Sequence, residues 1–201
     1  MIETPHGPAR VHLHPIDEPR AFLVLGHGAA GGVNAPDIVA ASAAANSEGV
    51  SVALVEQPYR VAGRRSPAPA KQLDTAWIAV VEWLREREFA GLPLVVGGRS
   101  LGARVACRTV EAAGAVAVLC LAFPLEPPGG RPSRLPELDT VTVPTLVVQG
   151  ESDPFGMPPP SPSREVVRVR GDHGLKSDLD AVAAAVQAWL ASVFSETPAR
   201  R

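Results

Sequence analysis

The sequence predicts an α/β protein in which helices cover both faces of a mostly parallel β-sheet. Two observations lead to this prediction. Short apolar runs alternate with longer amphipathic segments along the chain, which is typical of parallel strands joined by crossover helices. The apolar runs are continuous rather than interrupted by polar residues, as in strands that are buried on both faces. The 201 residues contain no internal repeat, so we expect one domain over residues 1–201.

Seven short segments are expected to be strands, the first of them at an edge of the sheet. They cover residues 10–14, 21–25, 51–55, 94–96, 116–122, 145–148 and 165–170. Four longer segments are expected to be helices. They cover residues 36–47, 71–89, 100–113 and 179–194. The second of these helices has Leu73, Trp77, Val80 and Leu84 at helical spacing. Residues 195–201 are expected to form a frayed tail.

Three Pro-rich segments interrupt this pattern, at residues 56–70, 124–140 and 154–162. Proline removes a backbone N–H donor and ends helices, so the first two segments are predicted to be surface loops. The third separates the last two strands, and we expect the connecting helix there to be shortened or absent. We place no domain boundary in these segments and expect no cap domain.

Charge and composition exclude several classes of protein. The formal net charge is −2 and the isoelectric point is about 6.2, without the basic excess of a typical nucleic-acid-binding protein. The N-terminus has no signal-peptide pattern, and no apolar stretch is long enough to span a membrane, so a cytoplasmic protein is expected. Cys107 and Cys120 lie in apolar surroundings and are expected to be reduced, buried thiols. No Cys/His spacing indicates a metal site.

A Gly-x-Ser-x-Gly motif at residues 98–102 is the strongest catalytic signal. It lies between an expected strand and an expected helix, which is the context of a nucleophile elbow. Such a turn is sharp, and glycines avoid collisions between its backbone and its neighbours. Ser100 is therefore predicted to be a nucleophile, with the positive end of the following helix beneath it. The alternative is a Gly-rich turn in which Ser100 only caps the helix.

The Gly-rich segment at residues 26–32 follows the first buried strand. Its turn is expected to aim the N–H of Ala29 at a substrate oxygen, so that this group and the N–H of Leu101 form an oxyanion hole. The same glycines also match the G-x-G-x-x-G pattern of dinucleotide-binding proteins, and Glu56 lies near the position where that pattern needs an acid. The motif around Ser100 favours the first interpretation, so no cofactor is expected.

His173 is the candidate general base. It is the only histidine after Ser100, and an elbow of this kind is followed in the chain first by an acid and then by a histidine. Asp153 follows the penultimate strand and is the candidate acid that holds the imidazole in the correct tautomer. Asp172 and Glu151 are alternative acids, although a side chain adjacent to His173 normally points away from its ring. A solvated loop histidine and a simple Asp-Pro turn are the non-catalytic alternatives.

Three further side chains are candidates for substrate binding: His27, Arg60 and Arg99. Arg60 belongs to a basic loop that also contains Arg64 and Arg65, and this loop would attract a carboxylate or phosphate if it folded over the site. The alternative is a solvated basic surface. The alternative for His27 is a structural role within its turn.

These motifs resemble those of small α/β-hydrolase-like proteins related to dienelactone hydrolases. Within that group, the closest resemblance is to the hydrolase-like domain of a subunit of the animal NSL chromatin complex and of a testis-expressed protein. The matching segments are GHGAAGG at 26–32, QPYRVAGRRSPAP at 57–69, GGRSLGAR at 97–104, QGESDPFG at 149–156 and GDHGLK at 171–176. The resemblance covers nearly the whole chain and implies an α/β-hydrolase fold with Ser100, Asp153 and His173 as a catalytic triad. It implies no particular substrate.

The expected function is that of a serine hydrolase acting on a carboxylic ester, thioester or lactone. A small-molecule substrate is expected, with neither a nucleic acid nor a membrane as partner. The alternative is a non-catalytic binding or scaffold protein on the same fold, because relatives in the resembled group occur in protein complexes. The presence of serine, acid and histidine in the required chain order favours the hydrolase.

Overall fold

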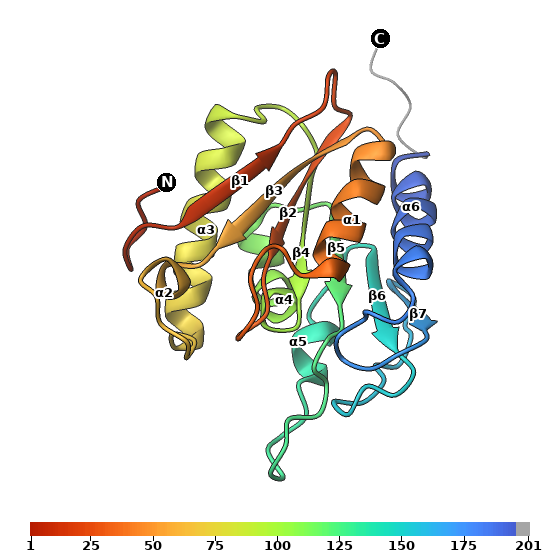
Figure 1. Ribbon diagram of the computed structural model, residues 1–201. Coiled ribbons are helices and arrows are strands. Elements are labelled where there is room, and N and C mark those ends of the chain that lie inside the picture. Colours follow the sequence, from red (N-terminus) through yellow and green to blue (C-terminus); the bar gives the residue numbers. More distant parts are fainter. Residues whose placement is uncertain (196–201) are drawn as a thin grey trace.

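A seven-stranded sheet forms the centre of the protein in the computed structural model, which describes residues 1–195 (Figure 1). The strands are β1 (Arg10–His14), β2 (Ala21–Gly26), β3 (Val50–Glu56), β4 (Leu94–Arg99), β5 (Ala117–Leu121), β6 (Thr145–Gly150) and β7 (Arg164–Val169). Their order in the sheet is β1-β3-β2-β4-β5-β6-β7. Only β1 is antiparallel to its neighbour, so the mostly parallel sheet predicted from the sequence is confirmed.

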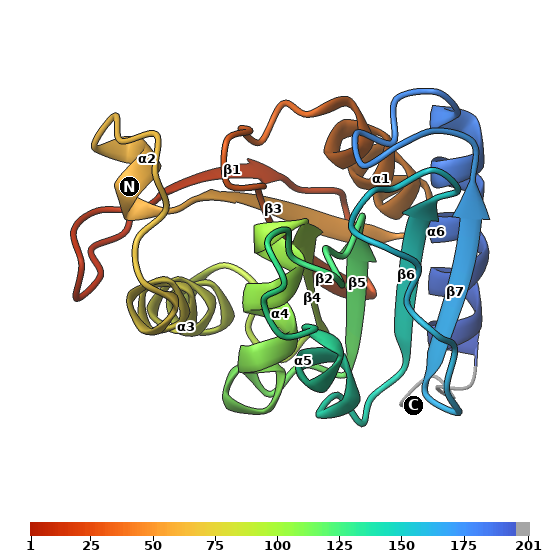
Figure 2. The same ribbon diagram turned by 90° about the horizontal axis from the view of Figure 1, so that it is seen from below.

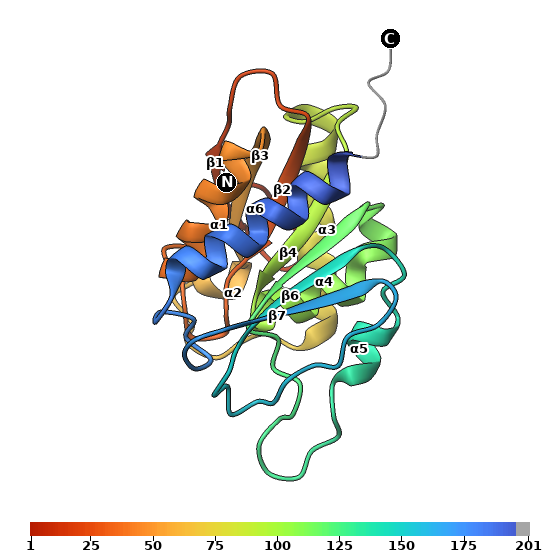
Figure 3. The ribbon, with the colours of Figure 1, turned by 90° about the vertical axis from the view of Figure 1, so that its right-hand side faces the viewer.

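Helices cover both faces of this sheet (Figure 2). The helices are α1 (Pro36–Ser47), α2 (Pro58–Val61), α3 (Ala70–Arg87), α4 (Leu101–Ala113), α5 (Leu135–Asp139) and α6 (Leu179–Ser195). α1 and α6 pack side by side on one face (Figure 3), while α3, α4 and α5 lie on the other. This arrangement confirms the layered α/β architecture.

The two faces of the sheet contribute to two separate apolar cores. Phe22 and Val24 of β2 pack into the core beneath α3 and α4, whereas Leu23 and Leu25 pack into the core beneath α1 and α6. Because successive side chains of a strand point to opposite faces, a strand covered on both faces must be apolar at every position. This explains the continuous apolar runs in the sequence.

Two short helices occur in segments that were expected to be loops. α2 begins at Pro58, and α5 has a proline in its first turn. Proline is tolerated in the first turn because the N–H there has no partner within the helix. Between β6 and β7 the chain forms turns and contains no helix, as expected for residues 154–162.

The remaining differences concern the ends of elements. β4 extends three residues further than expected, to Arg99, and α4 begins at Leu101 because Ser100 is not in helical conformation. α6 includes Ser195, which was assigned to the tail, and residues 196–201 lie outside the described part of the chain. None of the described helices has both the length and the apolar character needed to cross a bilayer.

Candidate active site

Ser100 lies at the carboxyl end of β4, in a sharp turn between this strand and α4. Its φ of +51° and ψ of −105° are unusual for a residue with a side chain, and they cost backbone strain. Its N–H donates a hydrogen bond to the carbonyl of Leu121, the last residue of β5, at 2.9 Å. The surrounding sheet therefore holds this strained turn in place and leaves the hydroxyl at the edge where sites in parallel sheets form.

The glycines on either side of Ser100 allow the turn to pack directly against β2. A Cβ atom at Gly98 would lie 2.5 Å from the carbonyl oxygen of Gly26, and one at Gly102 would collide with the same carbonyl group. Real Cβ atoms do not approach backbone atoms so closely. The two glycines of the motif are therefore required by the packing of β4 and α4 against β2.

Three of the predicted catalytic side chains form one hydrogen-bonded chain. The Oγ of Ser100 lies 3.0 Å from Nε2 of His173, and Nδ1 of His173 lies 2.8 Å from Oδ2 of Asp153. The carboxylate of Asp153 is fully buried. The structure does not bring the two alternative acids to His173: Glu151 is exposed, and the carboxylate of Asp172 accepts the N–H of Gly174 at 2.8 Å.

Two residues that sequence reasoning missed hold Asp153 and His173 in place. The side-chain amide of Gln149 donates to Oδ2 of Asp153 at 2.9 Å, and the N–H of Phe155 donates to Oδ1 at the same distance. The ring of Phe155 also packs on the imidazole of His173, with centroids 4.5 Å apart. The two hydrogen bonds to Asp153 satisfy carboxylate oxygens that burial removes from water. Gln149 lies near the end of β6 and Phe155 follows this strand, and both belong to the segment 149–156 that carries the family resemblance.

Ala29 and Leu101, the two residues predicted to form an oxyanion hole, line the same cavity as Ser100. Both residues line this hollow of about 360 Å³, and within residues 1–195 neither N–H donates a hydrogen bond to another group of the protein. The hydroxyl of Tyr59, another residue that the sequence reasoning did not select, donates to the carbonyl of Ala29 at 3.0 Å. Burial raises the pKa of Tyr59 to about 12, so it remains a donor. The arrangement offers two unpaired donors beside the serine.

His27 has a structural position, which corrects its prediction as a substrate-binding residue. The side chain is buried; its Nδ1–H donates to the carbonyl of Gly28 at 2.7 Å, and its Nε2 accepts the N–H of Gln57 at 3.2 Å. Burial lowers the pKa of His27 and keeps the ring neutral. Both ring nitrogens are therefore occupied within the protein.

Arg99 and Arg60, the other two candidates for substrate binding, do not line the Ser100 cavity. The guanidinium of Arg99 donates to the carbonyl of His173 at 2.9 Å. Its Nε lies 3.0 Å from Oδ2 of Asp37, a fully buried carboxylate whose pKa is raised by burial against the attraction of Arg99. Arg99 therefore links the backbone of His173 to the buried carboxylate of Asp37.

The basic loop contributes apolar residues to the cavity rather than its arginines. Pro67 and Ala68 line the hollow, and the positive charges at its wall come instead from Arg104, Arg108 and Arg134. Sequence reasoning missed these three. Arg104 and Arg108 could have been found from their positions four and eight residues after Ser100, because this spacing places them on the same face of one helix.

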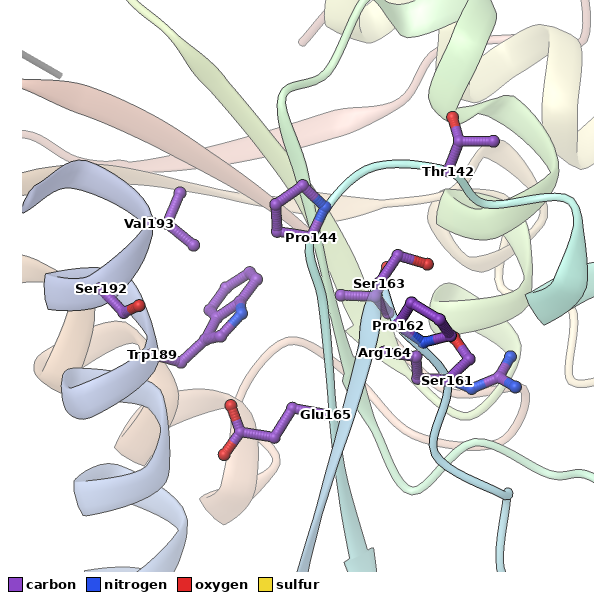
Figure 4. Close-up of a pocket in the computed structure, with 11 residues that line it drawn as sticks. Thr142, Pro144, Ser161, Pro162, Ser163, Arg164, Glu165, Trp189, Ser192 and Val193 are labelled. Atoms are coloured by element: carbon purple, nitrogen blue, oxygen red, sulfur yellow. The ribbon is translucent and has the colours of Figure 1, made fainter. Parts of the chain in front are cut away.

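A larger hollow of about 530 Å³ lies elsewhere (Figure 4). It is formed by Trp189 and Val193 of α6 and by residues near the starts of β6 and β7, such as Pro144 and Glu165. The amino ends of the strands lie at the opposite edge of the sheet from Ser100. The two hollows share no lining residue among those described. Within residues 1–195, no cluster of His, Cys, Asp and Glu could hold a metal ion at either place.

Comparison with known proteins agrees with this fold. Solved structures that resemble this protein include a serine hydrolase without a lid from Xanthomonas campestris (20% identity, 98% of this chain and 94% of that chain, TM-score 0.79). Another is Est1E from Butyrivibrio proteoclasticus, solved with ferulic acid bound (16% identity, 94% of this chain and 96% of that chain, TM-score 0.76). A third is a dienelactone hydrolase from Anabaena variabilis (16% identity, 92% of this chain and 91% of that chain, TM-score 0.73). No curated protein matches the sequence.

The family model described as "Alpha/beta hydrolase domain" matches residues 19–181. This span includes the serine turn, the acid and the histidine, and it covers most of the sheet. The chain therefore belongs to the alpha/beta hydrolase domain family.

Proposed function

We propose that this protein is a serine hydrolase that cleaves a carboxylic ester, thioester or lactone. The observation that carries the proposal is the continuous hydrogen-bonded chain from Ser100 through His173 to the buried Asp153. A structural serine would need neither a strained turn nor a histidine that is oriented by a carboxylate on its far side.

In the first half of the reaction, Oγ of Ser100 attacks the substrate carbonyl while its proton passes to Nε2 of His173. The new oxyanion accepts hydrogen bonds from the N–H groups of Ala29 and Leu101; one such donor contributes about 3 kcal/mol in comparable sites. His173 then returns the proton to the leaving oxygen or sulfur, and the carbonyl–heteroatom bond breaks. Asp153 keeps the proton on Nδ1 throughout and stabilises the imidazolium.

In the second half, a water molecule gives its proton to His173 and attacks the acyl-serine. The bond between the acyl carbon and Ser100 breaks, the serine recovers its proton, and the carboxylic acid leaves. The cavity beside Ser100 has a volume of about 360 Å³ and is lined by eight apolar residues and three arginines besides Ser100. This size favours a short acyl or aryl ester over a long chain. No step requires a cofactor.

Labelling by a fluorophosphonate, together with hydrolysis of p-nitrophenyl butyrate, tests the proposal. The wild type is expected to be labelled and to turn over the ester, whereas Ser100→Ala is expected to do neither while remaining folded. His173→Gln should lose turnover to a similar extent. Equal turnover by wild type and Ser100→Ala would refute the proposal. A folded wild type that reacts with neither reagent would favour the non-catalytic binding protein that the resemblance to the NSL-complex subunit suggests.

A further inference from the structure

The Ser100 cavity continues along one face of α4. Ser100, Arg104 and Arg108 follow one another at intervals of four residues, and all three line the hollow. Each interval corresponds to a rise of about 6 Å along the helix. The facing wall is apolar and includes Pro67 and Leu73. A substrate that reaches Ser100 therefore lies beside a row of guanidinium groups.

Two of these guanidinium groups already have carboxylate partners. Arg104 binds Glu137 through two hydrogen bonds of 2.9 and 2.6 Å. Arg108 binds Asp74 in the same way, at 2.9 and 2.6 Å. Such paired, fork-like contacts neutralise the charge of each arginine and fix its side chain. Neither arginine therefore offers an uncompensated charge to a ligand.

Arg134 also lines the cavity and differs from them. Its Nη1 donates to the carbonyl of Pro124 at 2.9 Å, and within residues 1–195 no carboxylate lies within 4.0 Å of its guanidinium. Burial lowers the pKa of Arg134, and the nearby charge of Arg104 lowers it further, against the attraction of Glu137. The cavity wall therefore carries one net positive charge with no partner from the described part of the chain.

We propose that the Ser100 cavity selects esters that carry one carboxylate, which Arg134 binds by its free N–H groups. The proposal rests on the hydrolase function proposed above and names its substrate class. A carboxylate matches the single uncompensated charge, and its two oxygens fit the planar donors of a guanidinium. A phosphate dianion carries two negative charges, whereas the described part of the cavity wall offers only the one uncompensated positive charge of Arg134.

Matched esters that differ only in this charge test the proposal by turnover. The first pair is mono-p-nitrophenyl adipate, which has a free carboxylate at the far end of its acyl chain, and the methyl ester of that carboxylate, which is neutral. The second pair is 4-carboxyphenyl butyrate and its methyl ester, in which the charge lies on the leaving group. In at least one pair, Arg134→Gln is expected to lower kcat/KM for the charged ester by about 10- to 100-fold relative to the neutral one. Arg134→Lys should retain part of this preference.

Arg65→Gln is the matched control, because Arg65 is exposed in the basic loop and does not line the cavity. It is expected to leave both esters unaffected. Circular dichroism and thermal unfolding of Arg134→Gln show whether this variant is folded, independently of turnover. A charge preference that is absent from the wild type, or one that a folded Arg134→Gln keeps in both pairs of esters, would overturn the proposal. So would a preference that Arg65→Gln removes.

Calorimetric binding to Ser100→Ala separates this proposal from the hydrolase function, since it needs no turnover. Monomethyl adipate is expected to bind more tightly than dimethyl adipate, and Arg134→Gln in the same background should remove the difference. This result would support the carboxylate site even if no ester were hydrolysed. Equal binding of the two compounds, or tighter binding of inorganic phosphate than of monomethyl adipate, would refute it.

Discussion

Replacement of Arg99 by methionine is predicted to lower the free energy of unfolding by about 3–5 kcal/mol at neutral pH. The carboxylate of Asp37 is fully buried, and Arg99 provides the cation 3.0 Å away. Removal of one partner of a buried ion pair leaves an uncompensated charge, which is why the loss is large. For 201 residues the entropy of unfolding is about 0.4 kcal/mol per degree, so the expected fall in Tm is about 7–12 °C.

The predicted loss depends on pH, and its sign follows from Asp37. Burial already raises the pKa of this carboxyl in the folded protein, and loss of Arg99 raises it further. A carboxyl group with a raised pKa destabilises the fold increasingly as pH rises from its unfolded value through the folded one. The difference between variant and wild type should therefore be largest at neutral pH and should shrink as the pH falls toward about 5.

Urea unfolding of the wild type, Arg99→Met and Arg99→Met/Asp37→Asn measures both effects. The double variant is expected to recover most of the loss, since it no longer buries an unpaired charge. Arg20→Met is the control: Arg20 pairs with Glu48 at 3.3 Å in a partly exposed position, and its loss should cost less than about 1 kcal/mol. The reasoning would be refuted if Arg99→Met lowered the free energy of unfolding equally at neutral pH and at about pH 5, and if Asp37→Asn did not restore it.

Three further predictions follow from the site. Asp153→Asn should lower kcat for an ester by about 10³- to 10⁴-fold, whereas Asp172→Asn should leave it nearly unchanged, as steady-state kinetics would show. Gly102→Ala should destabilise the protein in thermal unfolding, although this exchange within a helix ordinarily stabilises by about 1 kcal/mol, because the new Cβ would collide with the neighbouring strand. Tyr59→Phe should lower kcat by about two- to tenfold with the fold intact, because Ala29 loses the hydrogen bond that orients its peptide group.

The architecture was predictable because it depends on local patterns. Continuous apolar runs identified the buried strands, and the spacing of Gly98, Ser100 and Gly102 identified the turn after β4. Asp153 and His173 were then selected because an elbow of this kind is followed along the chain first by an acid and then by a histidine. Each of these steps uses only residue type and sequence distance.

The roles assigned to His27, Arg60 and Arg99 could not be decided in that way. A histidine or arginine near a strand end has the same sequence signature whether it faces the cavity or the core, and only the packing of α1 behind β4 gives Arg99 a buried carboxylate as partner. The wall of the cavity likewise depends on long-range contacts: Arg134 reaches it from a Pro-rich segment that was predicted only as a surface loop.

The position of the charges relative to the nucleophile follows from α4 itself. This helix begins at the residue after Ser100, supplies one proposed oxyanion donor in Leu101, and carries Arg104 and Arg108 on successive turns. Distances along a helix are rigid, so any substrate group held by this wall lies at a set distance from the serine. Arg134, in contrast, comes from a loop held by its bond to Pro124. Under the two proposals, the rigid helix would position the substrate carbonyl through Leu101, and Arg134 of the loop would select which substrates bind.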